Sequence, residues 1–196
     1  MKLALVYDRV NKLGGAERVL TALHHLWPQA PLYTGVYYPP GASWAKGWDI
    51  RVSLINHLPW AKQHHEWYFW LMPLGLETFD LSDFDLVLSV CSDFTKGVLT
   101  QPAQLHLSYI FSPTRYLWLE PQEYRSWSRG VFRPILAPIL SQLRHWDYLA
   151  AQRPDQLITI SQTTRRQIQK YYHRDAHVIY PPVNTDFFKP RLRADR

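Results

Sequence analysis

Cysteine and long hydrophobic runs are both scarce in this sequence of 196 residues. The single cysteine, Cys91, excludes an internal disulfide and any zinc site built from several thiolates. A chain without disulfides is typical of a reducing compartment, so we expect a cytoplasmic location. The longest apolar run, Trp67–Leu76, has ten residues including a proline, whereas a bilayer-spanning helix needs about 20. The N-terminus is no signal peptide, because Asp8 interrupts the first apolar run after five residues.

Acidic residues are scarce in the last third of the chain. Residues 125–196 hold 13 of the 22 lysines and arginines but only 5 of the 16 aspartates and glutamates. The formal charge of +6 therefore belongs to one region, and we expect no nucleic-acid partner, since the remainder is acidic and no recognition motif occurs. Basic and aromatic residues combine in 60–72 and 125–146, which is typical of a peripheral protein at the inner face of an anionic membrane. Core packing with solvated arginines predicts the same pattern.

Motifs for cofactors, metals and covalent catalysis are also missing. The sequence has no G-x-G-x-x-G, no P-loop and no G-x-S-x-G elbow. His64–His65–Glu66 lacks the H-E-x-x-H spacing of a metal site on a helix. We therefore expect no metal and no cofactor, and the residues alone assign no catalytic nucleophile.

Short apolar runs alternate with amphipathic segments, which is the pattern of an α/β domain with a mostly parallel sheet. The predicted strands are 3–7, 32–37, 50–55, 84–90, 105–111, 157–160 and 178–180. The predicted helices are 15–27, 60–79, 94–99, 134–152 and 162–172, the last of them capped by Ser161.

A glycine pair, Gly14–Gly15, stands where the first predicted helix begins after the first strand. Glycines there let a ligand approach the backbone closely, and the free N–H groups of the helix start favour a phosphate. A tight turn needs the same glycines, so the sequence alone leaves both interpretations open. Lys96 follows another predicted strand and is a weaker phosphate candidate, because a lone lysine in such a loop is usually solvated.

A second candidate region follows the strand predicted at 105–111, at the sheet edge where open α/β folds bind ligands. Arg115 beside Tyr116 and Trp118 offers a guanidinium for an anion next to an aromatic stacking surface. The alternative is an aromatic helix that packs on the sheet, with Arg115 paired to a glutamate a few residues later.

Five motifs occur in a characteristic order along the chain. They are LVYDRVNKLGGAERVL at 5–20, FDLSDFDLVLS at 79–89, TKGVLT at 95–100, SPTRYLW at 112–118 and VIYPPVNTDFF at 178–188. With these motifs the chain resembles the N-terminal half of a family 4 glycosyltransferase, the retaining class with the GT-B fold of two Rossmann-like domains. The resemblance covers the chain from its first residue to about residue 188.

The resemblance implies a Rossmann-like three-layer domain with a mostly parallel sheet, which forms half of a GT-B fold and holds the acceptor. In such enzymes a C-terminal domain holds the nucleotide-sugar, which is a substrate, and no metal is needed. The implied activity is that of a hexosyltransferase in polysaccharide biosynthesis, with a saccharide or lipid-linked acceptor. Catalysis then rests on positioning and on stabilisation of the diphosphate charge.

Site residues also follow from the resemblance. Gly14 and Gly15 fall in the loop that faces the donor diphosphate. The residues assigned to the acceptor or to the cleft side are Asp8, Arg9, Glu17, Lys96, Phe111, Ser112, Arg115, Tyr116 and Trp118.

Two features depart from a complete family member. Phe111 stands where a histidine is usual, which predicts altered substrate choice or weakened catalysis. Residues 189–196 resemble the start of the interdomain linker, so we expect residues 1–188 to form the N-terminal domain. The donor-binding domain is then a missing partner, and the isolated chain is expected to be inactive. The alternative is a stand-alone, non-catalytic domain that binds a glycan or a protein partner.

Overall fold

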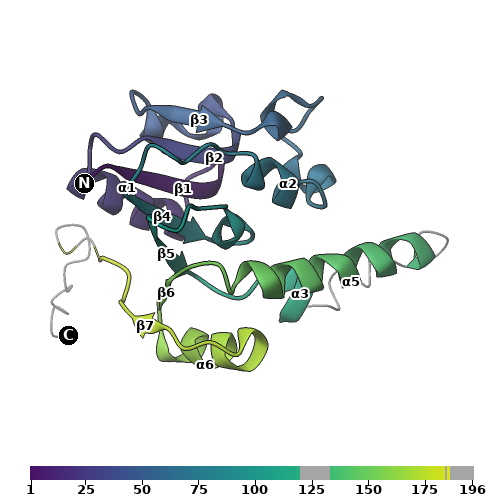
Figure 1. The fold of residues 1–196 in the computed structure, drawn as a ribbon. Helices are drawn as coiled ribbons and strands as arrows, with labels where there is room; N and C mark the ends of the chain where they lie inside the picture. The colour runs from purple at the N-terminus through teal and green to yellow at the C-terminus, as the bar shows by residue number, and fades with distance from the viewer. Residues whose placement is uncertain (120–132, 184, 186–196) are drawn as a thin grey trace, which may run out of the picture.

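The fold is a Rossmann-like α/β domain around one seven-stranded sheet in which every strand is parallel to its neighbours (Figure 1). The computed structural model describes residues 1–119, 133–183 and 185. The strand order is β3-β2-β1-β4-β5-β6-β7. The strands are β1 Leu3–Val10, β2 Leu32–Tyr37, β3 Ile50–Val52, β4 Leu86–Cys91, β5 Leu105–Ile110, β6 Gln156–Thr159 and β7 His177–Val178.

The helices cover both faces of the sheet and make it the middle of three layers. They are α1 Gly15–Leu26, α2 Met72–Glu77, α3 Arg115–Trp118, α5 Arg133–Ala150 and α6 Gln162–Tyr172. Five 3-10 turns join them, at Pro39–Gly41, Ser43–Ala45, Leu54–His57, His65–Tyr68 and Thr95–Gly97. Figure 1 shows α5 extending past the edge of the sheet on the side where α2 lies.

Alternate residues of the central strand β1 pack against different layers. Leu5 belongs to the cluster that includes Leu20 of α1, whereas Val6 belongs to the cluster that includes Leu76 of α2 and Leu143 of α5. Because both faces are covered, residues 3–7 of the strand are continuously apolar rather than alternating, as the sequence predicted. Each such side chain contributes about 1.5–3 kcal/mol by its burial.

Most predicted elements are confirmed. The strand predicted at 50–55 is shorter, because β3 ends at Val52, and the helix predicted at 94–99 is only the 3-10 turn Thr95–Gly97. β2 and α6 have the predicted bounds, and the Ser161 hydroxyl caps α6 by accepting from the Thr164 N–H. β1 continues past its predicted end at residue 7 and ends at Val10. The buried Asp8 fits inside the strand because backbone N–H groups of the loop after β4 donate to its carboxylate.

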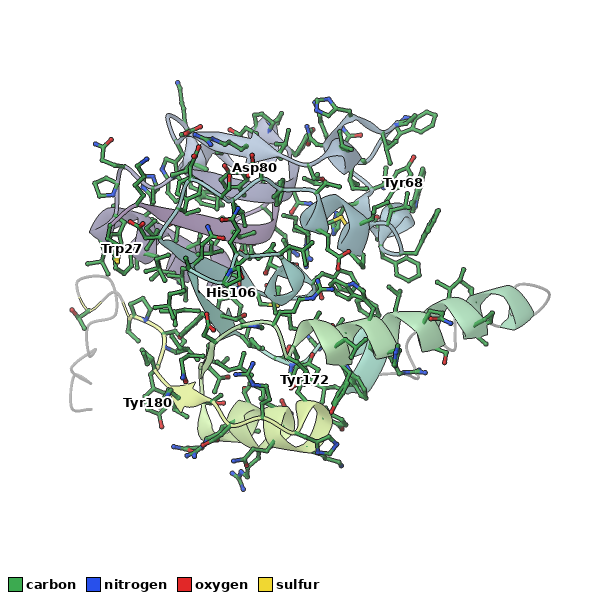
Figure 2. The ribbon with its side chains drawn as sticks, in the orientation of Figure 1. Trp27, Tyr68, Asp80, His106, Tyr172 and Tyr180 are labelled. Carbon is green, nitrogen blue, oxygen red and sulfur yellow. The ribbon has the colours of Figure 1, made fainter. Side chains whose placement is uncertain are left out.

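The single long helix predicted for 60–79 is wrong. This segment forms the turn His65–Tyr68 and the short helix α2 instead. Trp60 has a left-handed backbone, with φ 54°, which interrupts any helix at its start. Tyr68 lies at the outer end of this segment, away from the sheet (Figure 2).

The strand order reverses between β1 and β4, because the chain leaves β1 toward β2 and later returns to the other side of β1. In open parallel sheets the crevice outside the carboxyl ends of two such strands is the usual ligand site. No helix within the described ranges is long and apolar enough to cross a bilayer. The predicted linker 189–196 and residues 125–132 of the basic aromatic segment lie outside the described residues.

Candidate functional site

A cavity of about 280 Å³ lies at the carboxyl ends of β1 and β4, where the strand order reverses. The turn His65–Tyr68, α2 and the start of α3 complete its walls. Its lining residues are Asp8, Arg9, His65, Glu66, Phe69, Met72, Asp93, Phe94, Arg115 and Tyr116. Four of the residues predicted from the sequence, Asp8, Arg9, Arg115 and Tyr116, are therefore brought together here.

Asp8 shapes this cavity by fixing the loop after β4. Its Oδ2 accepts from the backbone N–H groups of Ser92 and Asp93 at 2.7 and 2.9 Å. Its Oδ1 accepts from those of Phe94 and Thr95 at 2.6 and 3.1 Å. Burial, together with the nearby Asp93 charge, raises the pKa of Asp8, although these backbone bonds oppose the rise. The carboxylate is fully engaged, so Asp8 positions other groups instead of presenting a free carboxylate to a ligand.

Arg9 and Asp93 form an ion pair across the cavity wall. Their side chains are 22% and 19% exposed, so both remain within reach of a ligand. Burial lowers the pKa of Arg9, but the carboxylates of Asp93 and Asp8 outweigh this effect and raise it overall. The pair thus presents a fixed guanidinium and a fixed carboxylate side by side, which suits a ligand with several hydroxyl groups.

His65 is a neutral imidazole in the opposite wall. Burial, with the repulsion of Arg9, lowers the pKa of His65 to about 4. In the neutral ring Nδ1 accepts from the Asn11 side-chain amide, 3.2 Å away, and leaves Nε2–H as a donor. Sequence reasoning missed His65 and the adjacent Glu66, because neither belongs to a motif and the Asn11 partner of His65 lies 54 positions away.

Aromatic rings close the remaining side of the cavity. The Tyr116 ring meets Phe69 at 6.0 Å and 90°, and Phe94 at 6.1 Å and 75°, both edge-on. Arg115, the first residue of α3, is exposed beside them. The site therefore combines charged hydrogen-bonding groups with aromatic edges. The alternative pairing of Arg115 with Glu120 or Glu123 falls outside the described residues.

Lys96 departs from the prediction that it faces a ligand. Its side chain is fully buried, and its ammonium donates to Asp147 Oδ1 at 2.6 Å, to the Asp93 carbonyl at 2.6 Å and to Thr114 Oγ1 at 3.3 Å. Burial lowers the pKa of Lys96, but the Asp147 carboxylate outweighs it and raises the pKa well above its usual value. All three donors are used, so Lys96 is a structural cation in this conformation.

Trp118 belongs to the same buried network. Its indole N–H donates to Asp147 Oδ2 at 2.7 Å, and the Tyr172 hydroxyl donates to the same oxygen at 2.7 Å. Tyr172 lies between α5 and α6 (Figure 2). The hydrogen bond from the Trp118 indole thus anchors α3 to α5. Trp118 does not line the cavity at the ends of β1 and β4.

Gly15, the second glycine of the pair, lines a second cavity of about 730 Å³ at the start of α1. Gly14 precedes α1 as its N-cap, and Gly15 is its first residue. A Cβ at Gly15 would meet no atom within 4 Å, so its backbone is open to a ligand. A Cβ at Gly14 would lie 2.8 Å from Glu17 Oε2, so the Glu17 side chain would have to shift.

Glu17 lies beneath this helix start and is buried. Its Oε1 accepts from the Tyr7 hydroxyl at 2.7 Å. Burial, followed by the charge of Glu17, raises the pKa of Tyr7, so the phenol stays protonated. Glu17 therefore supports α1 from inside, and the prediction that it contacts the acceptor has no geometric support.

Phe111 and Ser112 follow β5 and line neither of these two cavities. The half-buried Phe111 ring packs toward the α1 layer and meets the Tyr109 ring edge-on at 5.5 Å.

Among residues 1–119 and 133–183, no three histidine, cysteine or acidic side chains converge in a way that would hold a metal ion. No protein-family model matches this sequence, and no curated protein matches it either.

Proposed function

We propose that this chain is the acceptor-binding N-terminal domain of a retaining glycosyltransferase of the GT-B type. The observation that carries the proposal is the polar and aromatic cavity at the point where the strand order reverses, beside an open glycine at the start of α1. The proposed reaction moves a sugar from a nucleotide-sugar to a saccharide or lipid-linked acceptor. The motif series in the sequence supports the same assignment.

Each side of this arrangement has a chemical role in the proposal. Arg9, Asp93 and Arg115 hold acceptor hydroxyls through charge-assisted hydrogen bonds, and the edges of Phe94 and Tyr116 exclude water. The first turn of α1 points unpaired N–H groups toward the donor diphosphate, which helix N-termini favour. Catalysis by positioning needs no protein nucleophile.

Replacement of one cavity residue tests the proposal. With the natural gene product, labelled nucleotide-sugars and membrane extract as acceptor, we expect transfer of label and a fall in kcat/KM of about tenfold or more for Arg115→Gln. Arg166→Gln, an exposed arginine of α6, is the matched control and should leave transfer unchanged. Equal rates for both variants, or no transfer from any common nucleotide-sugar, would contradict the proposal.

The second domain of the family is essential to this view, because it holds the donor. We therefore expect the 196 residues alone to bind the acceptor without transferring sugar. Transfer by the isolated chain would show that it contains a donor site of its own.

A non-catalytic glycan-binding domain is the second candidate, and Phe111 favours it. The ring has no group for hydrogen bonding or proton transfer, and it packs against Tyr109 rather than lining the cavity. Under this alternative the natural gene product binds the glycan but neither transfers nor hydrolyses the nucleotide-sugar. Restoration of activity by Phe111→His would favour the enzyme instead.

A peripheral contact with an anionic membrane, from the cytoplasmic side, completes the proposal. The tryptophan patch (Trp60, Trp67, Trp70 and Leu74) keeps its four side chains between 50% and 67% exposed. Indole rings prefer the membrane–water interface. We expect binding to phosphatidylglycerol-containing vesicles to fall about tenfold in W60A/W67A. The matched control is Trp27→Ala, a partly exposed tryptophan just after α1. Equal vesicle binding by both variants would contradict this contact.

A further inference from the structure

A shallow depression of about 480 Å³ between α5 and α6 lies apart from both cavities described above and shares no lining residue with either. Four of its side chains are basic or become so on protonation: Arg144 and His145 from α5, Lys170 from α6, and His173 immediately after α6. The others are aromatic: Trp118, Tyr148 and Tyr171. Within residues 1–119 and 133–183, no carboxylate is among the residues that line it.

The aromatic wall of this depression is anchored from behind. The Trp118 indole N–H is held by Asp147, 2.7 Å away in the buried network. The Trp118 ring packs on Tyr171 at 5.3 Å with a 36° tilt. A ligand would therefore meet a preformed surface and would not have to order loose side chains, which lowers the cost of binding.

Arg144 is the best-oriented of the four basic side chains. It is half-buried, and its Nε donates to the Leu117 carbonyl at 2.9 Å, which fixes the plane of the guanidinium. Within the described part of the chain its two terminal nitrogens have no acidic partner, whereas Arg153 and Arg165 nearby each pair with a carboxylate. A fixed guanidinium with two free nitrogens is the geometry that binds a phosphate in bidentate fashion.

A purely structural explanation covers only part of the cluster. Lys170 and His173 stand at the C-terminal end of α6, where cations complement the partial negative charge of the helix. Arg144 and His145 belong to α5, away from its C-terminal turn, and the same explanation does not apply to them. Four basic side chains converge here with no acid among the described lining residues, which indicates an anionic ligand.

We propose that this depression binds the phosphate group of an anionic ligand, with Arg144 and Lys170 as the principal contacts. Lys170 lies over the Tyr171 ring at 5.4 Å, so its charge and the aromatic surface face the same ligand. The part of the ligand next to the phosphate packs on Trp118 and Tyr171. This site is independent of the proposed sugar transfer, and either assignment stands if the other fails.

Inorganic phosphate is the probe that tests the site. In a 15N-labelled chain we expect phosphate, titrated at constant ionic strength, to shift the Trp118 indole N–H resonance in a saturable way. Arg144→Gln and Lys170→Gln should each weaken this affinity about tenfold, through loss of one charge-assisted contact. Arg166→Gln removes the same charge from α6 outside the depression and should leave the affinity unchanged.

Three outcomes would overturn the proposal. They are an equal shift with chloride at matched ionic strength, an unchanged affinity in Arg144→Gln with a native circular dichroism spectrum, and an equal loss in Arg166→Gln.

Two further experiments identify the source of the phosphate. A soluble ester predicts that glucose 1-phosphate binds more tightly than inorganic phosphate. A lipid headgroup predicts that Arg144→Gln reduces binding to phosphatidylglycerol vesicles, while phosphatidylcholine vesicles bind neither protein.

Discussion

Two buried carboxylates, Asp8 and Asp147, determine how the ligand-facing residues are held. Each accepts four hydrogen bonds: Asp8 from four successive backbone N–H groups, and Asp147 from Lys96, Thr114, Trp118 and Tyr172. A buried charge is tolerated only when it is paired and hydrogen-bonded in this way. The two networks meet at the Asp93 carbonyl, which accepts from Lys96. The shape of the cavity wall therefore depends on these two buried hydrogen-bond networks.

The sequence selected Asp8 and Lys96 as candidate site residues, and the structure places the charged group of each in a buried hydrogen-bond network. Asp147 lies 51 positions from Lys96 and belongs to no motif, so nothing local indicates that it neutralises the lysine. A lysine in a loop after a strand has the same local sequence whether it faces solvent or a buried carboxylate. Only the tertiary packing of α5 against the loop after β4 decides between the two.

Removal of Lys96 should expose this dependence. Lys96→Met keeps the length of the side chain but leaves the fully buried Asp147 without a counter-charge, so we expect a loss of about 3–5 kcal/mol in the free energy of unfolding. The double variant K96M/D147N removes both charges and should be the more stable of the two. Urea unfolding followed by circular dichroism measures the difference. An equal loss in both variants would show that packing, not charge, dominates at this site.

At the scale of elements, the buried strands were the most predictable part of the molecule. Short, mostly apolar segments such as 32–37 and 86–91 are stable only when both faces are covered, between two helical layers. The segment 60–79 was mispredicted because its aromatic side chains fit the period of a helix, whereas its backbone does not form one continuous helix. Trp60 is left-handed, and Pro73 has no N–H to donate and stands in the first turn of α2.

Gly41 and Gly15 differ in the space that surrounds their backbone. A Cβ at Gly41, in the turn Pro39–Gly41, would collide with the backbone carbonyl of Asn11, whereas a Cβ at Gly15 would meet nothing. We expect Gly41→Ala to destabilise the fold by about 1–3 kcal/mol, because backbone cannot move aside as a side chain can. Gly15→Ala should leave the stability unchanged or raise it by up to about 1 kcal/mol.

Thermal unfolding of the two variants measures this contrast directly. Under the proposed function, Gly15→Ala also weakens donor binding in the natural gene product, because a methyl group then stands in the open backbone at the start of α1. A melting temperature for Gly41→Ala equal to that of the parent would show that the turn relaxes freely. A loss of stability in Gly15→Ala would mean that this glycine serves the fold.

At the scale of the whole molecule, the alternation of strands and helices was enough to predict a parallel sheet and a site at one edge of it. The reversal of strand order between β1 and β4 then selects the position of the cavity along that edge. The composition of the far wall was not predictable. His65 meets Asn11 across 54 positions, and the connecting segment has no periodic pattern that would fix its path. The strand order thus determines where the cavity lies, whereas long-range packing determines which side chains line it.

The stability of the whole molecule should depend on pH through His106, which lies in the interior of the sheet (Figure 2). Its side chain is fully buried, with Nε2 2.9 Å from the Ser89 hydroxyl, and burial lowers the pKa of His106 to about 4. The pKa of an unfolded histidine is about 6.5. Between these values the unfolded chain binds the proton and the folded chain does not, so acid favours unfolding. His65, with a pKa also lowered to about 4, acts over the same range.

We therefore expect the free energy of unfolding to fall as the pH decreases from about 6.5 to about 4, with His106 alone contributing on the order of 3 kcal/mol. Above about pH 6.5 both states are neutral at this residue, and its contribution is fully present. Urea unfolding across this range should give a shallower pH dependence for His106→Asn, which cannot take up the proton. Thr163→Asn replaces an exposed residue of α6 that has no titratable group and should keep the slope of the parent. If His106→Asn also keeps the parental slope, the acid sensitivity comes from other groups, because loss of a non-titrating contact changes the stability equally at every pH.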